Sequence, residues 1–161
     1  GVTCQGIEIN LEKINTAISR GVPVIHHDLD EGLGGFPDNF FDYVILQKTI
    51  QAVKRPMLVL DEMLRVGRFG VVSFPNFGHK DVIDSLVTTK RMPRTRILPY
   101  TWYDTPNIHL CTINDFLDWT SENGVLIAKA FVWTGGKVER FEPGIESIVE
   151  EALFVVYRKE Q

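Results

Sequence analysis

Three groups of polar residues follow three apolar runs of the sequence, and their types fit the recognition of a nucleoside. Glu8 ends the first run, Asp28 and Leu29 follow the second, and Gln47 follows the third. A carboxylate can accept two hydrogen bonds from the vicinal hydroxyls of a ribose. Asp28 and the backbone N–H of Leu29 have the groups needed to contact an adenine ring. We therefore predict that a cofactor is bound by Glu8, Ile9, Asp28, Leu29 and Gln47.

Each of these groups also has a simpler interpretation, and the residue types alone do not choose between the two. Glu8 could be a solvated acid that interacts with the positive end of the following helix dipole. The tract from His27 to Asp30 could be an aspartate-rich turn that satisfies its own backbone. The polar residues from Gln47 to Gln51 could form a plain helix-capping turn.

A second candidate region covers residues 76–111, which are rich in proline, aromatic and basic residues. We interpret it as a lid or insertion outside the sheet. His109 is the only credible general base by residue type, although a structural or binding role is favoured for it. The aromatic residues of this region could line a small-molecule site. The predicted substrate or partner pocket consists of Asn76, Phe77, Trp102, Tyr103 and His109.

Several kinds of chemistry are not indicated. The four histidines lack the spacing of a metal site, so we predict no metal. No nucleophile-elbow or phosphate-binding loop motif occurs, and catalytic residues remain unassigned. Cys4 and Cys111 are typical of free thiols in a reducing cytoplasm, where we expect the protein to be.

A cluster of basic residues lies within the insertion and consists of Lys90, Arg91, Arg94 and Arg96. It is either a solvated surface or a docking site for an acidic partner.

The elements that must position these residues alternate between strands and helices. We predict strands at residues 2–9, 22–25, 41–46, 69–74, 125–133 and 152–158. Helices are expected at residues 11–20, from residue 56 onward, and at residues 112–123, with a short helical turn near 147–150. The run at 41–46 is apolar enough to be buried on both faces. This order predicts an α/β, Rossmann-like, doubly wound and mostly parallel sheet with an antiparallel edge strand.

Composition limits the classes of partner. The 161 residues suit a single domain, here residues 1–161, and 44% hydrophobic with 24% charged residues is ordinary for a globular protein. A formal net charge of −4 argues against general affinity for nucleic acid or for an anionic membrane. We find no apolar run long enough to cross a bilayer, so no membrane contact is expected.

Together these runs resemble a known family. GIEIN, HHDLDEGL and VVSFPNFGH are similar to the class I methyltransferases that depend on S-adenosylmethionine (SAM). SFPNFGH followed by RMPRTRILPYTWYDTPNIHLCTINDF resembles the MetW family of bacterial methionine biosynthesis proteins. The resemblance covers residues 1–124 and implies that SAM is the cofactor, with Glu8 at the ribose and Asp28 and Leu29 at the adenine.

The resemblance also implies a partner, the homoserine O-acyltransferase MetX, and a role in forming O-acylhomoserine. One alternative is a SAM-dependent methyltransferase that acts on a small molecule. A less favoured alternative is an interaction module that has lost its cofactor. Whether such a protein is itself an enzyme is left open by its motifs. Fold alone does not choose among these functions.

The sequence departs from the family pattern at its start. Family members begin with a strand and a glycine-rich loop that precede the acidic residue matched by Glu8. That strand lies at the centre of the sheet, and its loop holds the amino-acid part of SAM. We therefore expect the sequence to be a piece of a longer protein, with weak or absent SAM binding by this piece alone.

Overall fold

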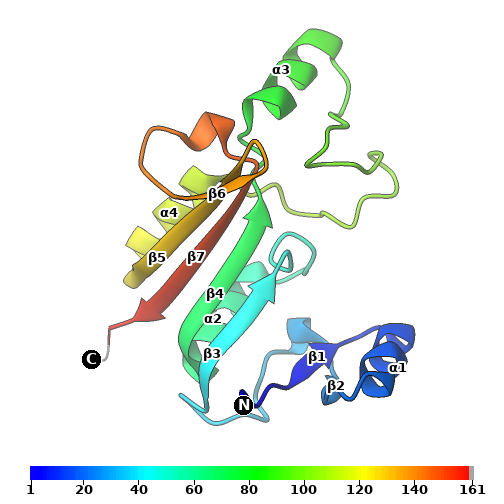
Figure 1. Ribbon diagram of the computed structural model, residues 1–161, viewed down its shortest axis with the longest axis vertical. Coiled ribbons are helices and arrows are strands. Elements are labelled where there is room, and N and C mark those ends of the chain that lie inside the picture. The colour runs from blue at the N-terminus through cyan, green and yellow to red at the C-terminus, as the bar shows by residue number, and fades with distance from the viewer. Residues whose placement is uncertain (160–161) are drawn as a thin grey trace.

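The computed structural model describes residues 1–159, which form two separate β-sheets flanked by helices (Figure 1). The smaller sheet has two strands and lies near the N-terminus. The larger sheet has five strands in the order β3-β4-β7-β5-β6. The α/β architecture predicted from the alternation of strand and helix patterns is confirmed.

The small sheet pairs β1 (Gly6–Glu8) with β2 (Val24–His26) in parallel, and α1 (Leu11–Ser19) connects them. The side chain of Asn10 caps α1, as its position before the apolar run predicts. The first strand is shorter than the predicted residues 2–9. Only three residue pairs join it to β2, so the residues before Gly6 have no neighbouring strand in this sheet.

In the larger sheet, β3 (Phe41–Gln47) and β4 (Gly67–Pro75) are parallel. The last strand, β7 (Glu151–Arg158), runs antiparallel between β4 and β5 (Val125–Thr134). The pairing of the last two predicted strands is confirmed, although β7 is an internal strand. The antiparallel edge strand is β6 (Lys137–Arg140), which pairs with β5 and which the sequence pattern did not reveal.

Two helices cover one face of this sheet, α2 (Pro56–Val66) and α4 (Ile113–Glu122), both of which lie behind it in Figure 1. Pro56 opens α2, as predicted. The helix predicted at residues 112–123 is confirmed, and Thr112 and Asp115 form a capping box at its start. A third helix, α3 (Lys80–Thr89), was not predicted and projects away from the sheet within the expected insertion.

The covered face of the sheet forms the core. The side chains of Val72, Phe74, Phe154 and Val156 alternate toward α2 and α4 and are fully buried. The opposite face is open, and the prediction that residues 41–46 are buried on both faces is wrong. Because β3 is an edge strand with helices on one side only, it leaves Ile45 exposed to 66%.

Polar contacts join the segment after β2 to α2. The carboxylate of Asp30 accepts hydrogen bonds from the backbone N–H groups of Lys54 and Arg55, at 3.1 and 2.7 Å, just before α2 begins. Within α2, Arg65 donates to Glu62 and to the carbonyl oxygen of Leu33. The hydrogen bond from Arg65 lowers the pKa of Glu62 from its ordinary value. Charge-assisted bonds of this kind hold the segment in place.

Candidate functional site

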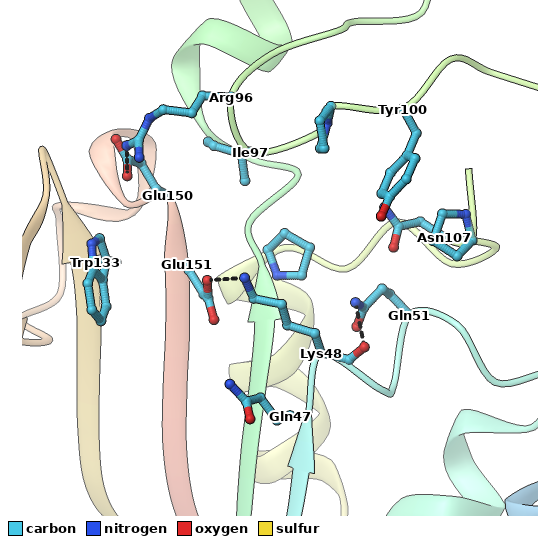
Figure 2. Close-up of a pocket in the computed structure, with 13 residues that line it drawn as sticks. Gln47, Lys48, Gln51, Arg96, Ile97, Tyr100, Asn107, Trp133, Glu150 and Glu151 are labelled. Atoms are coloured by element: carbon cyan, nitrogen blue, oxygen red, sulfur yellow. Dashed lines mark hydrogen bonds and ion pairs between the residues drawn. The ribbon is translucent and has the colours of Figure 1, made fainter. Parts of the chain in front are cut away.

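A cavity of about 640 Å³ lies at the edge of the sheet where β3 and β4 end and β7 begins. The carboxyl ends of parallel strands are where open α/β sheets bind ligands, and the volume suits a small molecule. A loop that returns from α3 covers part of it (Figure 2). The lining residues are Gln47, Lys48, Gln51, Pro75, Arg96, Ile97, Pro99, Tyr100, Pro106, Asn107, Trp133, Glu150 and Glu151.

Two ion pairs lie within this cavity, as Figure 2 shows. Lys48 Nζ lies 2.8 Å from Glu151 Oε2, and the Arg96 guanidinium pairs with the Glu150 carboxylate. The formal charges of these four side chains cancel. Glu151 reaches the cavity because β7 pairs with β4 in a register that places Glu151 opposite Pro75.

The turn after β3 fixes the position of one wall. Lys48 has a left-handed backbone with φ of 51°, and its N–H donates to the carbonyl oxygen of Ser73 at 2.9 Å. This bond ties the end of β3 to β4. Left-handed backbone is unusual for a residue with a side chain, and such residues gather at ligand sites.

Gln51 is buried and carries an unpaired acceptor. Its side-chain Nε2 donates to the carbonyl oxygen of Lys48 at 2.9 Å. Because a carbonyl only accepts, this bond fixes the orientation of the amide. The Oε1 atom then has no hydrogen-bond partner within residues 1–159. The main-chain oxygen of Gln51 accepts from Ile108 and His109, which holds the covering loop against this wall.

Glu8 and Ile9, predicted at a cofactor ribose, lie at the end of β1 and away from this cavity. Glu8 Oε1 accepts from the N–H groups of Ile9 and Asn10, both at 2.9 Å. Lys13 Nζ approaches the second oxygen at 3.9 Å. The Ile9 carbonyl oxygen is 3.1 Å from His26 Nε2. The carboxylate therefore has one oxygen bound by its own backbone and one in reach of a single exposed lysine.

Asp28 and Leu29 follow β2 at the same edge as Glu8, because β1 and β2 are parallel and Glu8 pairs with His26. Asp28 Oδ1 accepts from the N–H of Asp30 at 2.9 Å and caps a short 3₁₀ turn that begins at Leu29. Each of these two carboxylates, at neighbouring strand ends, thus has one oxygen that is not bound to its own backbone. Gln47 lies apart from them and lines the cavity.

Asn76 and Phe77 follow the end of β4 and were predicted to line a pocket. The Asn76 side chain is buried and donates to the carbonyl oxygens of Glu146 and Val149 at 2.8 and 2.9 Å. Its Oδ1 accepts from the N–H of Gly78 at 2.9 Å. The Phe77 N–H donates to the carbonyl oxygen of Cys111. The polar atoms of Asn76 thus hold the segment before β7 in place, and that segment carries Glu150.

Trp102, Tyr103 and His109, the other predicted pocket residues, belong to the loop after α3. The rings of Trp102 and Tyr103 pack edge to face with centroids 5.5 Å apart, and both side chains are more than 70% exposed. His109 is half-buried, its N–H donates to Gln51, and its buried Nε2 has no partner within residues 1–159. These three residues lie outside the lining of the 640 Å³ cavity.

Several residues that line the cavity were absent from the sequence-based prediction. The acids Glu150 and Glu151 come at the amino end of an antiparallel strand, which lies at the same edge as the carboxyl ends of its parallel neighbours. Two adjacent acids just before an apolar strand were the available signal. Trp133 lies next to the last residue of β5, at the same edge. Arg96 was noted only as part of a basic cluster.

Two further observations concern metals and membranes. Among the described residues 1–159, no three side chains of His, Cys, Asp or Glu gather in a way that could hold a metal ion. No helix in that range has the length and apolar character needed to span a bilayer.

Sequence comparison identifies relatives. The family model described as methionine biosynthesis protein MetW matches residues 1–156. The bifunctional methionine biosynthesis protein MetXA/MetW of Rhodopirellula baltica is 40% identical over 140 residues. That match includes 86% of this chain but only 22% of the relative, so the chain spans about a fifth of the relative's length.

Structure comparison finds SAM-dependent methyltransferases. One from Thermotoga maritima, a possible histamine N-methyltransferase, has a TM-score of 0.70 at 17% identity, over 96% of this chain and 72% of that one. One from Methanosarcina mazei has a TM-score of 0.65 at 15% identity, over 98% and 82%. At these identities the likeness shows the fold alone. The chain has the fold of class I SAM-dependent methyltransferases.

Proposed function

The chain belongs to the MetW family of methionine biosynthesis proteins, and we propose that it acts with the homoserine O-acyltransferase MetX in forming O-acylhomoserine. The observation that carries this proposal is the Rhodopirellula baltica relative, whose name joins MetXA and MetW in one bifunctional protein. Fusion keeps two units at high effective concentration, which is useful where they contact each other. Two free cysteines fit a location in the cytoplasm.

The surface proposed to contact MetX is the arm, which we define as residues 80–111. It consists of α3, which projects away from the sheet in Figure 1, and of the loop after α3, which returns over the cavity (Figure 2). Ile83, Leu86 and Val87 lie on one side of α3 at helical spacing and are 45–58% exposed. Trp102 and Tyr103, in the loop after α3, are exposed as well. Exposed apolar side chains that gather on one surface mark protein interaction sites.

We propose SAM as the ligand of the β1–β2 edge. Glu8 would accept hydrogen bonds from the ribose hydroxyls, and Asp28 would accept one from the adenine amine, while the Leu29 N–H faces a ring nitrogen. SAM is made from methionine, so this binding would let the end product regulate the acyltransferase. Because coupling between two ligands is reciprocal, MetX should also change the affinity for SAM.

A second function, methyl transfer to a small molecule, is favoured by one observation. The 640 Å³ cavity lies at the carboxyl ends of β3 and β4, where an acceptor could be oriented. SAM supplies a methyl group when it is bound. Turnover of SAM with an acceptor, in the absence of MetX, would support this function over the regulatory one.

The partnership is tested by mixing the chain with the MetX protein of the same organism. We expect the two to elute together in size-exclusion chromatography and the chain to raise the rate of O-acylhomoserine formation. Val87→Asp should weaken the complex at least tenfold, because a charge would enter an apolar contact. Ile18→Asp on α1 is the matched control, since Ile18 and Val87 are 57% and 58% exposed. No complex and an unchanged rate would rule the partnership out.

The cofactor is tested by calorimetric titration of SAM into the chain with and without MetX. Weak binding by the chain alone, which MetX strengthens or weakens, is the expected result. Glu8→Gln should lower the affinity, because an amide cannot accept from both ribose hydroxyls as a carboxylate does. Absence of SAM binding in every combination would remove the cofactor and leave a protein that acts through contacts alone.

A further inference from the structure

The cavity at the ends of β3 and β4 is lined by fixed charges of both signs. The Glu150 and Glu151 carboxylates lie deeper, at 16% and 27% exposure, and belong to the start of β7. Their partners Arg96 and Lys48 are 69% and 54% exposed and reach in from loops. Exposed bases on long side chains can swing aside at low cost, because such surface pairs are worth little. A ligand can therefore replace either base without disturbing the sheet.

The buried acceptor Gln51 Oε1 adds a second, independent requirement. Gln51 is 4% exposed, and its Nε2 is already bound to Lys48 O. An unpaired buried acceptor destabilises a folded protein unless a donor reaches it. The residue lines the cavity, and its Oε1 atom is shielded from solvent, so a ligand donor reaches this acceptor once the side chain turns toward the cavity. An ammonium group, with three N–H donors, can bond Gln51 and a carboxylate together.

We propose that this cavity binds a small zwitterion, a molecule with an ammonium and a carboxylate group as in an α-amino acid. The ammonium is held by Glu151 and Gln51, and the carboxylate by the released Lys48 or Arg96. A purely anionic ligand would face two half-buried acids, and a purely cationic one would leave two bases without partners. A ligand with both charges keeps the total charge at zero and gives a new partner to each group whose ion pair it breaks.

The apolar part of the cavity lining indicates the chemical character of the rest of such a ligand. Trp133, Ile97 and Pro99 present apolar surface to the cavity. An aliphatic side chain would bury area there at about 25 cal/mol per Å². The volume of about 640 Å³ also admits a larger molecule that carries an amino-acid end. The proposal is independent of the partnership with MetX, because binding is measured on the chain alone.

The direct test is calorimetric titration with three matched probes. Norvaline carries both charges, butylamine is the same molecule without the carboxylate, and pentanoate is the same molecule without the amine. We expect norvaline to bind at least tenfold more tightly than either single-charge probe, since each charge-assisted bond contributes a factor of about ten or more. Equal binding of all three probes, or no binding of norvaline, would overturn the proposal.

Two variants identify the groups that recognise the ammonium. Glu151→Gln removes the acid and should weaken norvaline binding by roughly ten- to hundredfold. Gln51→Leu has similar volume and removes the unpaired acceptor, so it should weaken binding without lowering the thermal unfolding midpoint by more than a few degrees. Glu142→Gln is the control, because Glu142 is exposed and does not line the cavity. A Gln51→Leu protein that binds norvaline as well as the parent would contradict the assignment.

Two sources could supply this chemistry, a free amino acid and the amino-acid end of a nucleoside-bearing molecule. Competition separates them. If S-adenosylhomocysteine displaces norvaline, the cavity holds the amino-acid end of the larger molecule. If both bind together, it holds a free amino acid. Either result supports the proposal, provided that Glu151→Gln weakens the binding of the ligand concerned.

Discussion

The two faces of the five-stranded sheet differ in what covers them. On one face, α2 and α4 bury Phe74 and Phe154 completely, and the rings of Phe154 and Phe116 stack with centroids 4.8 Å apart. On the other face, Tyr43 and Phe69 also stack, at 5.4 Å, but Tyr43 is 58% exposed. Similar aromatic contacts therefore occur in two different environments. The comparison shows that water exclusion, rather than ring contact, decides how much such a pair stabilises the fold.

The largest effect is expected at the centre of the covered face. Phe154→Ala should lower the free energy of unfolding by roughly 3–5 kcal/mol, because it removes a buried ring and leaves a cavity. Urea denaturation followed by circular dichroism measures the change. A loss under 1 kcal/mol would mean that this face is far less tightly packed than the structure shows.

A smaller effect is expected where α2 lies closest to β4. A Cβ on Gly70 would lie 2.3 Å from Cε of the buried Met63. Gly70→Ala should therefore destabilise the protein by about 1–3 kcal/mol through overpacking. Met63→Val removes the clashing atoms, so the double variant should be more stable than the sum of the two single effects predicts. Strict additivity would show that the two residues do not compete for space.

The reaction rates of the two cysteine thiols compare the covered core with the open part of the molecule. Burial, with a smaller contribution from Asp115, raises the pKa of Cys111 to about 12. At pH 8 its thiol stays protonated, so iodoacetamide should modify it at least about tenfold more slowly than the exposed Cys4. Stability from the buried thiol is complete below its ordinary pKa of 9.0 and is lost as the pH rises toward 12. Mass spectrometry of samples taken over time measures the two rates. The control is the same reaction in urea, where the protein is unfolded and the rates should be equal.

The smallest effect is expected on the open face. Tyr43→Ala should lower the free energy of unfolding by about 1 kcal/mol or less, because the ring is largely in water before and after unfolding. The same urea titration measures it beside Phe154→Ala. A cost as large as that of Phe154→Ala would show that another part of the protein covers this face in solution.

Local signals in the sequence predicted much of the fold. Asn10 marks the start of α1, Thr112 with Asp115 marks the start of α4, and Pro75 ends β4. These signals act within a few residues, so a single stretch of chain contains them. The helix α3 carried a usable pattern, with apolar residues at Val82, Ile83, Leu86 and Val87, but its cap is the side chain of His79, an uncommon capping residue.

The cavity could be predicted only in part, because distant strand pairing builds it. Gln47 was predicted as a binding residue because it follows a strand directly, and it lines this cavity. Glu151 reaches the same place through the antiparallel pairing of β7 with β4, and no local pattern specifies that register. The edge strand β6 was missed because Lys137–Arg140 is mostly charged and lacks the apolar alternation of a buried strand.

The free edges of the large sheet have consequences for colloidal behaviour. At one edge, β6 carries Lys137, Glu139 and Arg140, and charged side chains discourage another strand from adding there. At the opposite edge, β3 presents Tyr43 and Ile45 to solvent and carries a single charged residue, Asp42. Concentrated solutions should therefore form aggregates that grow by strand addition at β3. Ile45→Lys would place on this edge a charged side chain of the kind that already protects β6 against strand addition.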